Sequence, residues 1–355
     1  MSQTNNVTFR AAVLDELNAP LSVQTIRSNP LEVGQVMIRV HMSGICGAQL
    51  NEISGVKGPD RFLPHLMGHE GGGVVEAVGP GVRKVREGDR VVLHWRKGSG
   101  IESAFPGYVG EKGRVGGGLN TSFSEYTVAS ENRVTKIEAD IPFAIAALLG
   151  CGVTTGFGIV SKEAKLTIGE SIAVFGCGGV GLNVIQASAA VSAFPIIAVD
   201  VVEGRKKELA LKMGATHFVN TRATSSIGAI QDIVKSGVDV CVDTTGNTQV
   251  MNDSFECLAQ AGRLVLVGQP RFDRPLQIQK PLAFFGDRVM FASNGGRCNP
   301  DSDIPRLSRL YRAGKLDLGG IITHRFPLEK VNEALDVVRS GDCGRVMLEM
   351  DEVSK

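Results

Sequence analysis

The chain has 355 residues, with 38 lysines and arginines against 37 aspartates and glutamates. This near-balanced charge excludes a basic field that would gather nucleic acid or an anionic membrane, so a small-molecule partner is expected. The length exceeds the roughly 250–300 residues at which a single core stops growing, which predicts two domains. The 44 glycines, well above the usual ~7%, indicate many tight turns or close backbone approaches.

The N-terminal segment MSQTNNVTFR lacks the charged and apolar blocks of an export signal, and no later segment offers about 20 uninterrupted apolar residues. A cytoplasmic protein is therefore expected. Seven cysteines, an odd number in a long chain, argue against a disulfide framework. Each thiol is then a core filler, a metal ligand or a reactive group.

Up to about residue 150, short β-branched runs alternate with glycine turns, which predicts an all-β domain built as a partly open barrel. From Ala146 onwards, apolar strands alternate with helices, expected at 203–214, 226–237 and 249–262. This alternation predicts βαβ units and a doubly wound parallel sheet, hence an α/β protein.

The alternation stops near residue 295, where two amphipathic helices (304–315 and 328–341) precede a final short strand at 345–350. This tail is too small to fold alone and is expected to pack on the β domain. The predicted domains are therefore 1–153 together with 295–355, and 154–294.

A glycine-rich turn between an apolar strand and a long helix is the strongest local motif. It consists of Gly176, Cys177, Gly178, Gly179, Val180 and Gly181. Asp200 ends the next strand, nineteen residues after the last glycine. Amides at such a helix start hold a pyrophosphate, and the acid accepts hydrogen bonds from the adenosine ribose. The sequence thus predicts a dinucleotide-binding domain.

The strand end at Asp200 favours NAD over NADP, because a carboxylate repels a 2′-phosphate and the following Val201 and Val202 offer no cation. Arg205 and Lys206 follow shortly. Both either face solvent at a helix start or approach the cofactor, and Arg205 is the candidate for contact with the adenosine.

Candidate metal ligands lie in three segments: Gly44-Ile45-Cys46-Gly47, Gly68-His69-Glu70 and Gly150-Cys151-Gly152. Two thiolates, one imidazole and an open position make a catalytic zinc site, whereas a closed structural site uses four protein ligands. No CxxC pair occurs, and the three residues are spread over 105 positions. Spacing alone therefore leaves open whether these thiols bind metal or fill the core.

These segments, the glycine fingerprint and the C-terminal ITHRFPLEKVNEALDVVRSGDCGRV occur in an order that resembles the zinc-dependent medium-chain alcohol dehydrogenases. The resemblance spans nearly the whole chain and implies a GroES-like catalytic domain, a Rossmann domain and an active site in the cleft between them. It also implies that Cys46, His69 and Cys151 hold a catalytic zinc ion, that Glu70 acts beside the zinc or as a transient ligand, and that Arg345 contacts a cofactor phosphate.

Two departures from that family pattern stand out. Many relatives bind a structural zinc through four cysteines in the stretch corresponding to 94–126, where this chain has no cysteine, so one catalytic zinc per subunit, no structural zinc and a glycine-rich loop are expected. Ala48, Gln49 and Asn51 stand where the family usually has a Ser or Thr, an Asp and a His. Gln49 can still hydrogen-bond His69, but Ala48 cannot relay a proton. Either the proton leaves through water and Glu70, or the enzyme is slow or altered in chemistry.

Trp95, the only tryptophan, stands where relatives place a pocket-lining aromatic, and Ala48 and Asn51 complete the expected substrate pocket. Arg96 and Lys97 directly follow Trp95. They favour a polar or anionic substrate such as a sugar derivative, unless Trp95 is a wall residue and both cations face solvent. His65 and His94 could reach the site, but the sequence assigns a role to neither.

The expected activity is reversible hydride transfer between an alcohol, polar, polyol or sugar-like, and NAD. One alternative is a zinc-free NAD(P)H quinone or enoyl reductase of the same superfamily, which the Cys46, His69 and Cys151 set disfavours. Another is a non-catalytic NAD-binding redox sensor, supported only by Ala48 and Asn51. The strand near 289–293 is expected at the end of the parallel sheet, an edge that relatives pair across a two-fold axis, so a homodimer or homotetramer is expected.

Overall fold

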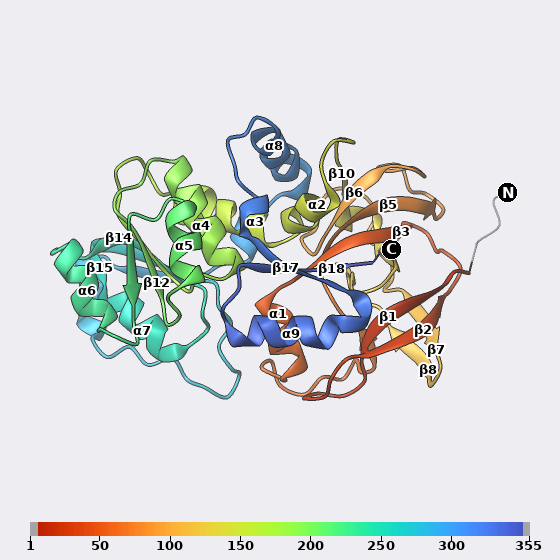
Figure 1. Cartoon of the computed structure of the whole chain (residues 1–355), viewed down its shortest axis with the longest axis horizontal. Helices are drawn as coiled ribbons and strands as arrows, with labels where there is room; N and C mark the ends of the chain where they lie inside the picture. Colours follow the sequence, from red (N-terminus) through yellow and green to blue (C-terminus); the bar gives the residue numbers. More distant parts are fainter. Residues whose placement is uncertain (1–5, 351–355) are drawn as a thin grey trace. The chain divides into compact units, whose positions relative to one another are not determined.

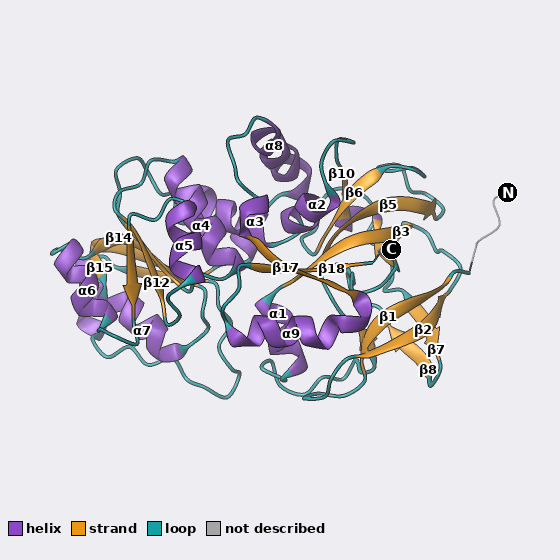
Figure 2. Ribbon diagram, viewed as in Figure 1, coloured by secondary structure: helices purple, strands orange, loops and turns teal. Residues whose placement is uncertain are grey.

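The computed structural model describes residues 6–350, so the first and last five residues of the expected catalytic domain lie outside it. Two compact units emerge: Met1–Cys151 with Asn299–Ser340 and Arg345–Lys355, and Gly152–Cys298 with Gly341–Gly344. Figure 1 traces the order of the elements, and Figure 2 separates helices from strands.

The boundary of the second unit differs from the expected 154 because helix α3 (Gly152–Gly158) packs closely on elements of this unit. A Cβ at Gly156 would lie 2.7 Å from the Asn183 Cβ on α4, and one at Gly158 would collide with the Gly296 backbone. Glycine at both positions lets the backbones approach, which ties α3 to the second unit.

The first unit contains a closed five-stranded barrel, which corrects the expectation of a partly open one. Its strands, in ring order, are β1 (Thr8–Leu14), β2 (Ser22–Ser28), β7 (Gly107–Gly110), β8 (Gly113–Gly116) and β4 (His65–Leu66). The glycine-rich stretch expected as a loop supplies β7 and β8, whose hairpin pairs with β2 on one side and with β4 on the other. Phe9 and Tyr108 meet edge to face inside this barrel, with ring centroids 5.9 Å apart.

A second sheet of the first unit positions the candidate metal ligands. Its strands, in order, are β10 (Val134–Lys136), β6 (Arg90–His94), β5 (Glu70–Val78), β3 (Gln35–Ile45), β18 (Arg345–Glu349) and β17 (Ile322–Pro327), with β9 (Tyr126–Ser130) also beside β3. The long strand β3 pairs antiparallel with both β5 and β18, so that Ser43 lies opposite Gly71 on one side and Leu348 on the other. The beginnings of β5 and β18 therefore meet near the end of β3.

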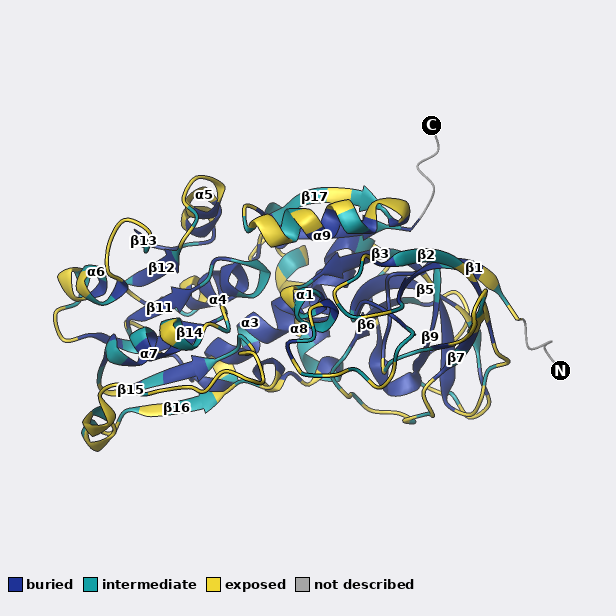
Figure 3. Cartoon of the chain, turned by 90° about the horizontal axis from the view of Figure 1, so that it is seen from below, coloured by how far each residue is buried: buried dark blue, intermediate teal, exposed yellow. Residues whose placement is uncertain are grey.

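Helices α1 (Gly47–Ile53), α2 (Phe143–Leu149), α8 (Pro300–Arg312) and α9 (Val331–Ser340) complete the first unit. Helix α9 buries Val331, Ala334 and Leu335, while Glu333, Asp336 and Arg339 are exposed, and Figure 3 shows the exposed residues as a yellow band along the helix. Its three- and four-residue spacing is the pattern from which a helix was expected here.

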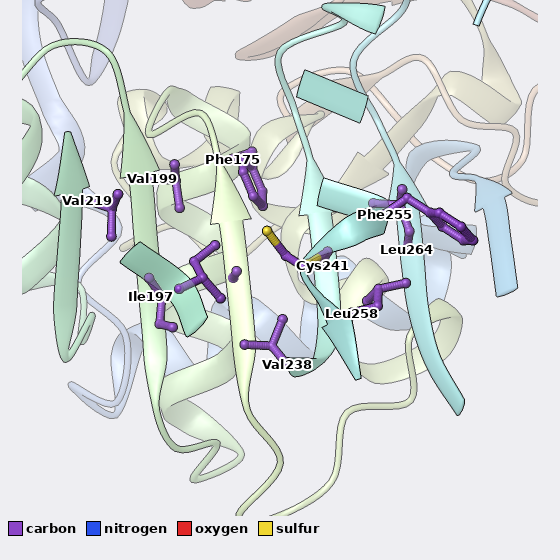
Figure 4. Packing of buried hydrophobic residues seen from close by; sticks show 12 residues of the cluster. Phe175, Ile197, Val199, Val219, Val238, Cys241, Phe255, Leu258 and Leu264 are labelled. Carbon is purple, nitrogen blue, oxygen red and sulfur yellow. The ribbon is translucent and has the colours of Figure 1, made fainter. Parts of the chain in front are cut away.

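The second unit is a six-stranded parallel sheet. Its order is β13 (His217–Asn220), β12 (Ile196–Asp200), β11 (Ile172–Phe175), β14 (Val238–Asp243), β15 (Leu258–Leu266) and β16 (Val289–Ala292). The chain starts at β11 and winds outward in both directions, which confirms the doubly wound prediction and places β16 at an edge. The connecting helices are α4 (Gly179–Ala190), α5 (Arg205–Lys212), α6 (Ser226–Ile233) and α7 (Thr248–Glu256). Figure 4 shows apolar side chains from these strands and from α7 that fill its core.

One expected helix is shorter in the structure, and one strand was not expected. The helix expected over 249–262 ends at Glu256, because Leu258 already pairs with Val238 and starts β15. The ladder is irregular just beyond, where Ala261 adopts φ 58°. Strand β17, which pairs with β18, was not expected at all.

Within residues 6–350 no single helix combines the length and apolarity needed to cross a membrane; the segments Phe143–Leu149 and Gly152–Glu163 meet that test only as a bent pair.

Candidate active site

Three expected ligands from distant parts of the sequence come together in the first unit. Cys46 lies between β3 and α1, His69 directly precedes β5, and Cys151 directly follows α2. Their Sγ and ring nitrogen atoms all lie within 4.8 Å of one another, and no other such group of three occurs within residues 6–350. The His69 Nε2 atom is buried without a hydrogen-bond partner. An orphaned imidazole nitrogen beside two thiols fits a zinc ion with three protein ligands.

The electrostatics of this group favour thiolate. A hydrogen bond with Cys151 holds the pKa of the Cys46 thiol well below its ordinary value; burial opposes this effect, while His69 and the positive charge of Arg345 add to it. Metals bind the thiolate form of cysteine, so the protein has already lowered the cost of deprotonating this ligand.

Buried side chains fix the backbone that carries His69. Gly68 adopts φ +91°, and any side chain there would crowd Ser122 and Phe123. Asn120 Nδ2 donates to the His69 carbonyl at 3.0 Å, and the Ser43 and Ser122 hydroxyls donate to the Glu70 carbonyl at 2.9 and 3.0 Å. Asn120 and Ser122 carried no signal in the sequence, because they lie some 50 residues downstream and only the fold brings them here.

Gln49 links two of the ligands. Its Oε1 accepts the Cys46 backbone N–H at 2.9 Å, and its Nε2 lies 2.6 Å from His69 Nδ1. The expected hydrogen bond between Gln49 and the imidazole is thus present. Because Nδ1 is engaged, Nε2 is the ring nitrogen left to face the two thiols.

Glu70, expected beside the zinc or as a transient ligand, does not belong to the group of three ligand atoms that lie within 4.8 Å of one another. Its fully buried carboxylate pairs instead with Arg345, which is only 3% exposed. Gly44 makes room for this pair, since a Cβ there would collide with the Glu70 carboxylate and lie 2.9 Å from Arg345 Nη2. Arg345, expected to contact a cofactor phosphate, therefore has a partner within its own sheet.

The three expected pocket residues occupy two elements. Ala48 and Asn51 are half-buried on the short helix α1, directly after Cys46. Trp95 is half-buried and follows β6, one residue beyond the His94–Glu70 pair of strand neighbours. The Arg96 guanidinium lies 5.3 Å from the Trp95 ring centre, and Lys97 pairs with Glu102.

His94 is a structural residue. Its Nδ1–H donates to the Arg96 carbonyl at 2.7 Å, and its Nε2 accepts from the Thr135 hydroxyl at 2.9 Å. Burial lowers the pKa of His94 to about 3. The ring therefore stays neutral in the folded protein at any moderate pH.

This pKa predicts a specific acid sensitivity. Between pH 6.5 and about 3 the unfolded chain binds a proton at His94 that the folded chain excludes, so stability falls as the pH falls through this window. A His94→Gln variant, whose amide can both donate and accept, should lose less stability than the wild type between pH 7.5 and pH 4.5. Urea unfolding at the two pH values measures this, and an unchanged pH dependence would contradict it.

The glycine turn of the second unit has the shape its sequence predicts. Gly176 adopts φ +91°, and a Cβ at Gly181 would collide with the Gly176 carbonyl, so both positions require glycine. A Cβ at Gly178 would meet nothing within 4 Å, and Gly179 and Val180 begin α4. The first amides of this helix therefore border open space, where a phosphate group fits.

A cavity of about 300 Å³ lies beside this turn. Its lining includes Gly176, Asp200, Val201, Thr221 and Thr245. Asp200 ends β12, as predicted, and its two carboxylate oxygens accept the backbone N–H groups of Cys177 at 2.7 Å and Val202 at 3.0 Å. The cavity, the acid and the helix start have the arrangement that the adenosine and phosphates of a dinucleotide require. Arg205, the expected adenosine contact, is exposed at the start of α5, whereas its neighbour Lys206 is buried.

Comparison with known proteins agrees with this geometry. Residues 32–139 match the family described as "Alcohol dehydrogenase GroES-like domain", and residues 179–312 match "Zinc-binding dehydrogenase". The chain is 32% identical to an S-(hydroxymethyl)glutathione dehydrogenase of Saccharomyces cerevisiae, over 97% of this chain and 96% of that protein. It is 34% identical to alcohol dehydrogenase 6 of Rattus norvegicus, over 98% and 99%. A benzyl alcohol dehydrogenase structure from Acinetobacter calcoaceticus superposes with a TM-score of 0.86 at 26% identity, covering 97% of this chain and all of that one.

Proposed function

The chain belongs to the zinc-dependent medium-chain alcohol dehydrogenases, which transfer a hydride between an alcohol and NAD, and from this premise we propose that Cys46, His69 and Cys151 hold its catalytic zinc ion. The observation that carries the proposal is the grouping of the three ligand atoms around the orphaned His69 Nε2. The same grouping argues against a zinc-free reductase.

The residues around the ligands have defined tasks in this proposal. When bound, zinc would supply a Lewis acid that lowers the pKa of the substrate alcohol, and NAD would supply the hydride acceptor. Gln49 holds the backbone N–H of Cys46, and the Glu70–Arg345 pair supports the strand from which His69 emerges. Ala48 and Asn51 offer no side chain that exchanges a proton. Because a relay through Glu70 would require its buried pair with Arg345 to open, water carries the substrate proton.

The substrate is an alcohol with a polar or anionic group. Trp95 offers an apolar wall, the Arg96 guanidinium lies beside its ring, and the exposed Lys97, which pairs with Glu102, follows directly in the sequence. Several relatives are named for S-(hydroxymethyl)glutathione, an alcohol that carries carboxylates. Adducts of this kind, formed from formaldehyde and a thiol, combine a small hydroxymethyl group with a charged tail that these cations suit.

A substrate panel tests this choice. NADH formation should be measured with S-(hydroxymethyl)glutathione, a polyol and benzyl alcohol. We expect the highest kcat/KM with the anionic substrate. Lys97→Met should raise the KM for this substrate several-fold, because one charged contact contributes about 1 kcal/mol. The KM for benzyl alcohol should not change. Lys112→Met, which removes an exposed lysine from the β7–β8 turn, is the matched control. A preference for benzyl alcohol would show instead that the pocket selects apolar rings, and no turnover of any alcohol would favour the sensor alternative.

A further prediction concerns Gln49. When His69 Nε2 binds zinc, Nδ1 carries the ring proton, and the amide nitrogen that faces it cannot accept that proton. An aspartate could accept both this N–H and the Cys46 backbone N–H. Gln49→Asp is therefore expected to bind zinc about tenfold more tightly, measured by competition with a chromogenic chelator. Gln49→Leu should bind it more weakly; equal affinities in all three proteins would contradict this role.

Assembly and location are proposed on separate observations. Strand β16 is one of the two edges of the parallel sheet, and Leu282, Phe285 and Val289 leave large apolar side chains exposed on and just before it. We propose that two copies pair at this edge to form a homodimer or a dimer of dimers. Light scattering should then give an even multiple of 37.7 kDa, and a monomer mass would contradict the pairing.

All seven cysteines are free thiols, which supports a cytoplasmic location.

A further inference from the structure

Two side chains of opposite charge hold the backbone of Cys177, inside the glycine turn, from both sides. Its N–H donates to Asp200 Oδ2 at 2.7 Å, and its carbonyl accepts from Lys206 Nζ at 3.0 Å. Cys177 itself is completely buried. Charged partners make stronger hydrogen bonds than neutral ones, so this peptide segment is held more firmly than an ordinary turn.

Lys206 differs from the basic residues around it. It is only 5% exposed, whereas Arg205 and Lys207 on either side are exposed. It shares the inward face of α5 with Leu209 and Ala210, where an apolar residue would pack without an electrostatic cost. A buried ammonium is costly unless it is hydrogen-bonded, so its bond to the Cys177 carbonyl compensates for the burial.

The held segment leads directly into the phosphate-binding amides. Gly178 follows Cys177 and caps α4, and a Cβ at Gly178 would meet nothing within 4 Å. The direction of these first amides is set by the peptide that precedes them. We propose that Lys206 is a positioning residue which, together with Asp200, keeps the turn in its cofactor-binding shape without touching the cofactor. The inference rests on NAD as the cofactor and is independent of the alcohol.

The same contacts give Asp200 a second task. Its carboxylate both faces the cofactor cavity and holds the Cys177 and Val202 amides. A substitution of Asp200 intended to admit a 2′-phosphate would also release the turn. Asp200→Ser should therefore weaken the binding of NADH and NADPH alike, rather than exchange one cofactor for the other.

The test compares Lys206→Met and Lys206→Arg with Lys207→Met. Lys207 is an exposed lysine on the same helix, and its side chain pairs with Glu203. Fluorescence titration measures the affinity for NADH, and competition measures that for ADP-ribose and adenosine. We expect Lys206→Met to lower the affinity for NADH and for ADP-ribose about tenfold, as for the loss of one charged hydrogen bond. The affinity for adenosine should change little. Lys206→Arg should recover most of the affinity, and Lys207→Met should match the wild type.

Alkylation of the cofactor-free protein separates positioning from direct contact. Burial raises the pKa of the Cys177 thiol, so iodoacetamide should modify it slowly in the wild type. In Lys206→Met the rate at Cys177 should rise about tenfold while Cys241 and Cys257 in the sheet core stay unmodified, which excludes general unfolding. Unchanged NADH affinity would overturn the proposal, and so would weaker affinity with unchanged Cys177 alkylation, because Lys206 would then act on the cofactor directly.

A measurement on the unsubstituted protein guards against a variant that fails to fold. Hydrogen exchange at the Cys177 amide, which donates to Asp200, should be slow in the cofactor-free wild type, as slow as in the neighbouring strand β11. Rapid exchange at this amide would show that the turn is not held before the cofactor binds, and would overturn the proposal. Neither outcome depends on whether the alcohol has been identified correctly.

Discussion

Replacing Cys46 by alanine is expected to lower kcat/KM by at least about a thousandfold, because a catalytic metal supplies several kcal/mol of transition-state stabilisation. The variant retains His69 and Cys151, but two ligands do not fix a metal with the required open position. The assay is NADH formation with the best alcohol of the panel, read beside the zinc content of the same preparation. Activity and zinc should be lost together.

Cys257→Ala is the matched control for this loss. Cys257 is also a free thiol, but it lies fully buried at the end of α7, and burial raises its pKa to about 12. Its removal should leave both zinc content and kcat/KM within a factor of two of the wild type. If Cys46→Ala kept full activity, the three-ligand group would have no part in the reaction.

The second large effect concerns stability. Arg345→Met should lower the free energy of unfolding by about 3–5 kcal/mol, since it leaves the Glu70 carboxylate buried without its partner. Both side chains lie at the junction of β5, β3 and β18, so no water can replace the guanidinium without opening the sheet. Urea unfolding with zinc and cofactor removed measures the change.

Arg325→Met on the adjacent strand provides the comparison. Arg325 pairs with Glu349 at 2.9 Å, but its side chain is 51% exposed, so the same substitution should cost only about 0–1 kcal/mol. Adding Glu70→Gln to Arg345→Met should recover part of the lost stability, because it removes the orphaned charge. Equal effects of Arg345→Met and Arg325→Met would show that burial does not strengthen the pair.

The sequence patterns predicted the second unit well because its signals are local. Strands such as β11 and β12 read as apolar runs, and the glycine turn lies between a strand and a helix in the sequence itself. The errors occur where pairing overrides local preference. The segment from Leu258 to Gly262 resembles a helix end, yet it forms β15 because Val238 offers a pairing partner.

The candidate site likewise combines residues that local sequence motifs indicate with residues that only the tertiary fold brings together. Cys46, His69 and Cys151 could be selected through family motifs, but spacing alone could not bring them together across 105 residues. The pairing of Glu70 with Arg345 could not be predicted, because strand β18 reaches β3 only through the tertiary fold. The burial of Lys206 could be predicted only from its spacing, because it lies three and four residues before Leu209 and Ala210 on the same helix face. Its charge favours the opposite expectation, an exposed side chain.

X-ray absorption at the zinc edge of the purified wild-type protein tests the central claim most directly. The account predicts about one zinc ion per chain, with two sulfur ligands and one imidazole nitrogen in its coordination shell. A shell without sulfur, a shell of four sulfurs, or an active protein that contains no zinc would contradict it.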